Sequence, residues 1–245
     1  VGDPACSVDK NLTDRINYQA IKRACEDLPK DIHVIFMSTC SVYGAQDDIL
    51  DEESSTNPLS EYAVTKLKAE DHIKERNGTI FRLGTVYGVG DAMSRIRLDL
   101  VVNVLTYNAI KNGNITVNGG DQWRPIISVK DISGYIIEAA ERKPNDTFVL
   151  SYQNTTIKDL GELVVNELPG TKINYTEISF QDARNYKVCA KKAEDYFNYV
   201  AKWSPANEIK QMEKIFREER LKNPDDEIYS NGKYLTELKR TNGFN

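Results

Sequence analysis

Two short apolar runs, separated by long amphipathic segments, constrain the fold of this chain more than any other feature. Apolar residues recur at helical spacing through residues 12–28, and a nearly continuous apolar run follows at 32–37. A second helix is predicted over 59–75 and a second strand over 79–83. Because the strands are joined through a helical crossover, we expect an α/β fold with parallel strands buried on both faces.

Downstream of Gly90 the predicted elements are shorter and of mixed type, which favours a small α/β lobe packed on the sheet. We therefore divide the chain into a sheet-bearing part (1–90), a mixed lobe with interleaved sheet elements (91–222) and a polar surface appendage (223–245). The expected elements after Gly90 are helices over 98–110, 132–140 and 157–167, strands over 114–117, 123–129 and 147–151, and a largely helical charged tail from 190.

Composition excludes several classes of partner. The net charge of −5 and the pI near 5.3 argue against a nucleic-acid partner. No apolar run approaches the roughly 18–20 residues that span a bilayer, so no membrane partner is expected. The four cysteines form no Cys-x-x-Cys pair and the two histidines are isolated, so we expect neither a metal site nor a disulfide framework. No signal peptide is visible, and the cytoplasm is the predicted location.

The chemistry is suggested by a Tyr-x-x-x-Lys pair and a hydroxyl-rich strand end. Tyr62 and Lys66 lie four residues apart on a predicted helix, so their side chains share one face. An ammonium close to a phenol is expected to lower the pKa of Tyr62 from its ordinary value of about 10. Such a tyrosine can exchange a proton with a hydroxyl held by Thr39, which ends the preceding strand. The alternative is a chance pair in a chain with 13 tyrosines, but its conjunction with the hydroxyl cluster favours catalysis.

These motifs together resemble those of a known family. Residues 38–44, Ser-Thr-Cys-Ser-Val-Tyr-Gly, resemble the Ser-Ser-(x)-x-Val-Tyr-Gly signature of extended short-chain dehydrogenase/reductases, the NAD-dependent epimerase/dehydratase group. Tyr62 and Lys66 match that family's Tyr-x-x-x-Lys pair, and Thr39 matches its catalytic Ser/Thr. Segments 82–88 and 122–131 are similar to two further family motifs, and the resemblance extends to about Trp203.

The resemblance implies a fold and a set of site residues. Residues 1–90 would be the C-terminal part of a Rossmann NAD(P)-binding domain, and 91–222 mainly its substrate-binding lobe. The implied catalytic residues are Thr39, Tyr62 and Lys66; the implied cofactor-binding residues are Asn17, Ser38, Tyr62, Lys66 and Leu83; the implied substrate-binding residues are Ser41, Thr85, Arg124 and Arg184.

The resemblance also implies a reaction. Tyr62 would remove a proton from a sugar hydroxyl while hydride passes to NAD or NADP, and Lys66 would hold the nicotinamide ribose. Arg124 would bind the diphosphate of a nucleotide-linked sugar, because a planar guanidinium suits phosphate oxygens; a surface ion pair is the alternative role for this arginine. A homodimer is expected by analogy with the family.

The chain departs from the family in two respects. Family members begin with a strand, a glycine-rich turn and a helix that receives the dinucleotide pyrophosphate; no such motif precedes Asp3. We therefore expect an incomplete parallel sheet whose first strands are missing, and weak or no NAD binding if the chain begins at Val1. Cys40 and Ser41 replace the Asp-Glu pair of family dehydratases, which disfavours elimination of water.

Three functions remain from the sequence. A nucleotide-sugar epimerase is the main hypothesis, and a reductase or dehydratase of the same family is its nearest alternative. A truncated, non-catalytic Rossmann-like binding module is the alternative from a different class. Retention of Thr39, Tyr62 and Lys66 together favours the enzyme.

Overall fold

The centre of the molecule is a parallel three-stranded sheet. The computed structural model describes residues 2–91, 94–177 and 185–242. The strand order is β1 (Ile35–Thr39), β3 (Thr79–Leu83) and β7 (Thr147–Leu150), with Met37 opposite Phe81 and Phe81 opposite Phe148. The predicted α/β class with parallel strands is confirmed.

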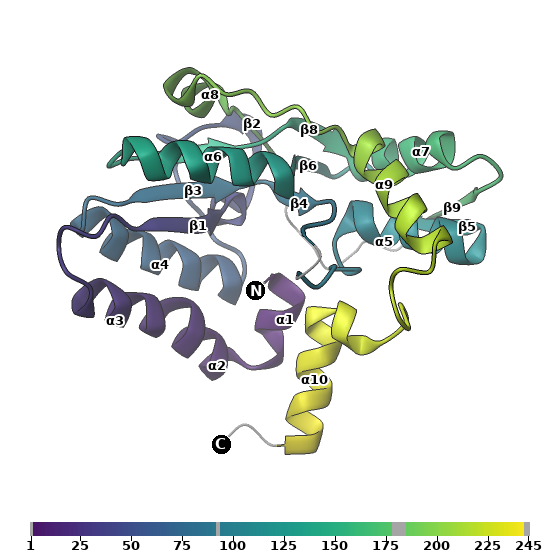
Figure 1. The fold of residues 1–245 in the computed structure, drawn as a ribbon, viewed down its shortest axis with the longest axis horizontal. Helices are drawn as coiled ribbons and strands as arrows, with labels where there is room; N and C mark the ends of the chain where they lie inside the picture. The colour runs from purple at the N-terminus through teal and green to yellow at the C-terminus, as the bar shows by residue number, and fades with distance from the viewer. Residues whose placement is uncertain (1, 92–93, 178–184, 243–245) are drawn as a thin grey trace.

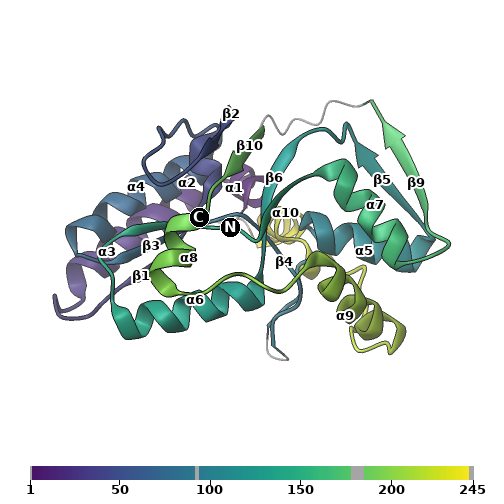
Figure 2. The ribbon, with the colours of Figure 1, turned by 90° about the horizontal axis from the view of Figure 1, so that it is seen from above.

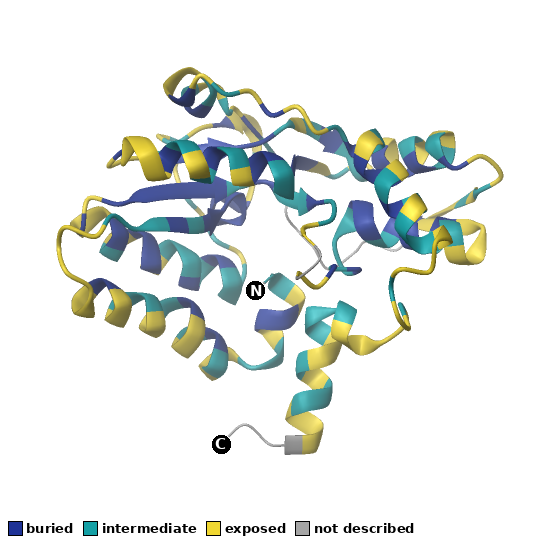
Figure 3. Cartoon of the chain, in the orientation of Figure 1, coloured by how far each residue is buried: buried dark blue, intermediate teal, exposed yellow. Residues whose placement is uncertain are grey.

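Helices cover both faces of this sheet. In Figure 1, α6 (Val129–Arg142) lies above the strands and α4 (Glu61–Glu75) lies below them. The strands are buried while the outer faces of the helices are exposed (Figure 3). Phe81 and Phe148 contact Phe197 of α8 (Lys191–Phe197), with ring centroids 5.8 and 4.8 Å apart, so aromatic side chains fill the core beneath α6. Burial on both sides explains why these strands read as continuous apolar runs.

The second half of the chain adds smaller sheets and three packed helices, seen at the right of Figure 2. Strand β6 pairs in parallel with β4 and antiparallel with β8, and β5 pairs in parallel with β9. A second apolar core includes Leu105, Leu160 and Ile209, one from each helix. The elements are β4 (Thr85–Tyr87), α5 (Val101–Asn112), β5 (Asn114–Asn118), β6 (Trp123–Ser128), β8 (Gln153–Thr156), α7 (Ile157–Glu167), β9 (Lys172–Thr176) and α9 (Pro205–Arg217).

The acidic segment that follows the first strand is partly a strand rather than the predicted loop. Strand β2 (Ala45–Leu50) pairs in parallel with β10 (Asn185–Val188), which comes some 140 residues later in the chain. Leu50 is buried, whereas Ile49 is exposed. A single buried apolar side chain in an acidic segment is too weak a signal to predict a strand, because the pairing partner is remote in sequence.

The N-terminal region is more helical than predicted. The predicted helix over 12–28 is observed as α2 (Lys10–Asp14), a π-helical turn η1 (Arg15–Gln19) and α3 (Ala20–Asp27), which follow one another without a break. The Asp9 carboxylate caps α2 by accepting the Leu12 N–H at 2.9 Å. A further short helix, α1 (Asp3–Val8), precedes it.

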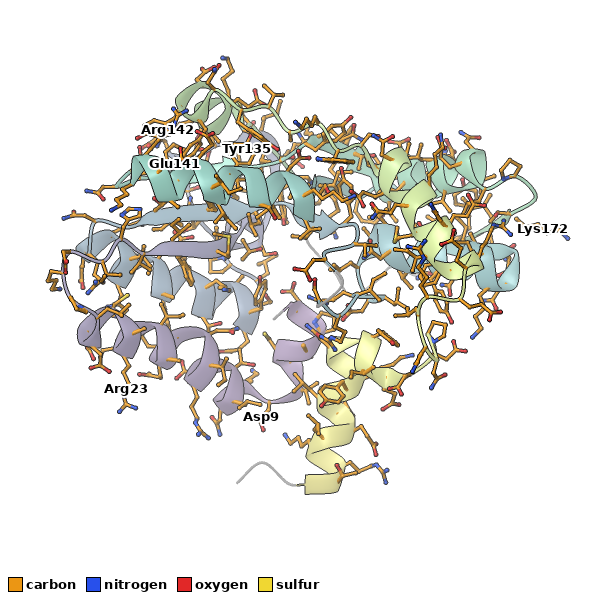
Figure 4. The ribbon with its side chains drawn as sticks, in the orientation of Figure 1. Asp9, Arg23, Tyr135, Glu141, Arg142 and Lys172 are labelled. Carbon is orange, nitrogen blue, oxygen red and sulfur yellow. The ribbon has the colours of Figure 1, made fainter. Side chains whose placement is uncertain are left out.

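The C-terminal segment returns to this N-terminal region. Helix α10 (Asn231–Asn242) lies against α1 (Figure 1). Lys239 Nζ is 3.1 Å from the Asp9 carboxylate and donates a hydrogen bond to Val8 O at 3.1 Å. Asp9 lies where α1 turns into α2, while Arg23 on α3 points outward (Figure 4). Residues predicted as a polar appendage therefore include a helix that contacts the beginning of the chain.

Across the part of the chain that the structure describes, no helix has both the length and the apolar character needed to cross a membrane. Over the same residues, no three His, Cys, Asp or Glu side chains come together as metal ligands would.

Candidate active site

Thr39 lies where β1 ends and the chain turns into the short 3-10 helix η2 (Cys40–Tyr43). Its hydroxyl accepts the Ser41 N–H at 3.1 Å and lies 3.1 Å from Ser41 Oγ. The turn closes at Gly44, whose φ is +74° and where a Cβ would lie 2.1 Å from Asn57 O, so only glycine fits. The backbone thus holds the Thr39 hydroxyl at the carboxyl end of a parallel strand, where α/β sheets place their ligands.

Helix α4 brings the Tyr-x-x-x-Lys pair to the same strand. Ser60 caps the helix by accepting the Ala63 N–H at 3.2 Å. The Tyr62 phenol is hydrogen-bonded to the Thr39 hydroxyl. One turn later, Lys66 Nζ donates to Met37 O at 2.8 Å and lies 4.6 Å from the centroid of the Phe36 ring. Three candidate catalytic side chains therefore meet along the last residues of β1.

The expected acidity of Tyr62 was wrong for this arrangement. Burial raises the pKa of the phenol above its ordinary value, the Asp3 carboxylate raises it further, and the hydrogen bond from Thr39 opposes these effects. Lys66 is not among the groups that chiefly shift this pKa, because its ammonium is bound to Met37 O. Spacing along the helix correctly predicted the shared face but not the electrostatic effect.

Burial lowers the pKa of Lys66 to about 8, against an ordinary value of 10.5, and only Cys6 opposes the shift. Between these two values the unfolded chain binds more protons than the folded chain, so the free energy of unfolding should rise with pH. We expect the Lys66 side-chain NMR signal to titrate near pH 8, and the parent to gain stability over a Lys66→Met variant as the pH rises from below to above 8. A titration midpoint at the ordinary lysine value would contradict this prediction.

Helix α1 covers the candidate catalytic residues from the N-terminal side. Ser60 Oγ donates a short hydrogen bond to the Asp3 carboxylate. Cys6 is buried, accepts a hydrogen bond from Asn17 Nδ2 at 3.4 Å and interacts electrostatically with both Tyr62 and Lys66. Asp3 and Cys6 were not predicted as site residues, because no sequence motif links α1 to α4.

The predicted cofactor-binding residues occupy different settings. Asn17 is buried in the π-helical turn η1, a local distortion that often accompanies functional sites. Leu83 lies opposite Thr39 in the register of β1 and β3. The Ser38 hydroxyl instead donates to the Glu70 carboxylate at 2.6 Å within the protein. Only the backbone of Ser38 is therefore free to contact a cofactor in this arrangement.

The predicted substrate-binding residues lie along neighbouring strands. Ser41 is buried beside Thr39, and Thr85 pairs with Ile126 between β4 and β6. Arg124, two residues before Ile126, is buried and donates to Trp123 O at 2.8 Å. Burial argues against a freely exposed surface arginine. Arg184 lies outside the described residues.

Residues 3–151 match the NAD dependent epimerase/dehydratase family. Over 125 residues the chain is 35% identical to a Bacillus subtilis (strain 168) protein described as "Uncharacterized UDP-glucose epimerase YtcB", covering 47% of this chain and 38% of that protein. The chain thus matches well under two thirds of this relative's length.

Two solved structures show the same fold at low sequence identity. A UDP-glucose 4-epimerase from Thermotoga maritima with UDP-glucose has a TM-score of 0.77 and 21% identity, covering 90% of this chain and 75% of that chain. RMD from Pseudomonas aeruginosa complexed with NADPH has a TM-score of 0.76 and 16% identity, covering 90% and 79%. Since the family match covers more than half of the sequence and includes the Thr39, Tyr62 and Lys66 motifs, the chain belongs to the NAD-dependent epimerase/dehydratase family.

Proposed function

We propose that this protein is an NAD(P)-dependent epimerase of nucleotide-linked sugars that acts by transient oxidation of a sugar hydroxyl. The observation that carries the proposal is the hydrogen bond between Tyr62 and Thr39 at the carboxyl end of β1, with Lys66 on the same face of α4. Relatives described as UDP-glucose epimerases support a nucleotide-sugar substrate.

The roles of the side chains follow from their contacts. The Thr39 hydroxyl and the Tyr62 phenol can together grip one substrate oxygen, and Tyr62 moves the proton at that oxygen. At neutral pH the raised pKa keeps the phenol protonated, so in this arrangement it is ready to donate rather than accept a proton. Displacement of the Asp3 carboxylate would lower that pKa, because a nearby negative charge disfavours the phenolate.

The residues around Lys66 fit one end of a dinucleotide. Lys66 and Tyr62 would hold the nicotinamide ribose, and the cofactor would accept a hydride from the sugar and return it. The fit does not extend to the pyrophosphate. In the ranges that the structure describes, no strand leads through a Gly-x-Gly-x-x-Gly turn into a helix, the usual pyrophosphate site.

A non-catalytic binding module is the second candidate function. It is favoured by the position of α1, whose Asp3 and Cys6 lie against the residues that a substrate and a cofactor would contact. The predicted homodimer and the predicted cytoplasmic location stay predictions under either function.

Turnover of a substrate panel tests the proposal. We would express the chain with whatever residues its gene encodes on either side, add NAD or NADP, and supply UDP-, GDP-, CDP- and dTDP-linked sugars in turn. We expect NMR of the products to show an inverted sugar carbon for at least one of these substrates. If none turns over with either cofactor while the protein is folded, the epimerase proposal fails and the binding module is favoured.

A further inference from the structure

Helix α4 is fixed to β1 at three successive turns. Tyr62, Lys66 and Glu70 follow one another at intervals of four residues, so they form one stripe along the helix. The stripe contacts three consecutive residues of β1: Tyr62 binds the Thr39 hydroxyl, Lys66 binds the Met37 carbonyl, and Glu70 binds the Ser38 hydroxyl. Two of these contacts involve candidate catalytic residues, and the third does not.

The third contact is the centre of a buried ionic network. Glu70 is fully buried, and its carboxylate accepts hydrogen bonds from Arg82 Nε at 3.1 Å and Arg82 Nη2 at 2.7 Å, in addition to the one from Ser38. Arg82 lies on β3 opposite Ser38, and its Nη1 donates to the Tyr43 hydroxyl at 3.0 Å. The network therefore joins α4, β1, β3 and η2, which is the turn that follows Thr39.

Stability alone is a weak reason for such a pair. Burying two charges costs about as much as their attraction returns, and well-packed apolar replacements are often as stable. A planar guanidinium bound through two nitrogens does, however, fix the direction and distance of its partner. Glu70 is two helical turns, about 12 Å, from Tyr62 on a rigid helix, so a shift at Glu70 is transmitted to the phenol.

We infer that Glu70, Arg82 and Ser38 are positioning residues that set the register of α4 against β1 and so hold Tyr62 opposite Thr39. The inference rests on the proposed function for its consequence on catalysis but not for its structural content. A misplacement of about 1 Å in a reacting group can cost about 100-fold in rate, so the network should affect kcat more than KM.

The test replaces both charges at once. Glu70→Leu combined with Arg82→Met leaves no unpaired buried charge, and we expect this double variant to fold with a stability close to that of the parent. We expect kcat to fall about 10- to 100-fold with KM little changed. The NMR signal of the Tyr62 ring, assigned by its absence in Tyr62→Phe, should shift or broaden because the Thr39 contact is disturbed.

Two further variants keep the result interpretable. Glu70→Asp preserves the charge pair with a shorter reach and should fold even if the double variant does not, with a smaller effect of the same kind. Lys74→Ala is the control, since Lys74 lies on the next turn, half exposed and 3.9 Å from Glu70, and should change neither readout.

The outcomes separate the two ideas. Variants at Glu70 and Arg82 that are folded, with the parental kcat and an unchanged Tyr62 signal, would overturn the positioning role. If no sugar is turned over by the parent, the proposed function fails, and the Tyr62 signal alone then decides whether the network positions the phenol.

Discussion

Replacing Tyr62 by phenylalanine is expected to lower turnover of the sugar substrate by about 100- to 10,000-fold, the usual contribution of a general acid or base. The substitution removes only the phenolic oxygen, which is hydrogen-bonded to Thr39, and leaves the ring in its place on α4. Substrate affinity should therefore change little, and the loss should appear in kcat. The measurement is the rate of product formation by NMR, with urea unfolding of the same preparations.

A matched control is Tyr196→Phe. Tyr196 is exposed on α8, far along the chain from the site, and packs against Phe148 through its ring rather than its hydroxyl. Both variants should unfold within about 1 kcal/mol of the parent, since each loses at most one hydrogen bond. A Tyr62→Phe variant that turned over substrate at the control rate would remove Tyr62 from the chemistry and with it the mechanism proposed above.

The pKa of Tyr62 shows what residue spacing leaves out. Four-residue spacing on a helix places Tyr62 and Lys66 on one face, and the structure has them there. The effect of one side chain on the other depends on burial and on third groups. Here Asp3, from a helix that the motif analysis did not predict, and Met37, through its backbone carbonyl, change the outcome.

The central sheet was predictable because its strands announce themselves. The runs that became β1 and β3 are apolar on both faces, and the helix between them has a clear cap and end. The β2–β10 pair and the contact of α1 with α10 were not predictable. Their residues are largely polar or exposed, and each contact joins segments separated by most of the chain, for which one sequence carries no local signal.

Asp131 illustrates a motif residue whose role the sequence could not assign. It ends the segment 122–131 that resembles a family motif, yet the structure places it in the first turn of α6, fully buried and directed at a backbone segment. Its carboxylate accepts the N–H groups of Lys202 and Trp203, each at 3.0 Å, and the Tyr199 hydroxyl at 3.1 Å. Asp131 thus anchors the connection from α8 to α9.

Asp131→Ala is accordingly expected to lower the free energy of unfolding by about 3–5 kcal/mol, because two backbone N–H groups and a phenol lose a charged acceptor at a buried position. Asp131→Asn should lose less, since its amide oxygen can still accept one of these bonds. Equilibrium urea unfolding measures both. Asp146→Ala is the control: Asp146 is half exposed and pairs with Lys192 at 2.7 Å, and an exposed pair contributes about 1 kcal/mol or less. If Asp131→Ala were as stable as this control, the α8–α9 connection would be held by its aromatic contacts, such as Tyr135 against Tyr199, rather than by the buried carboxylate.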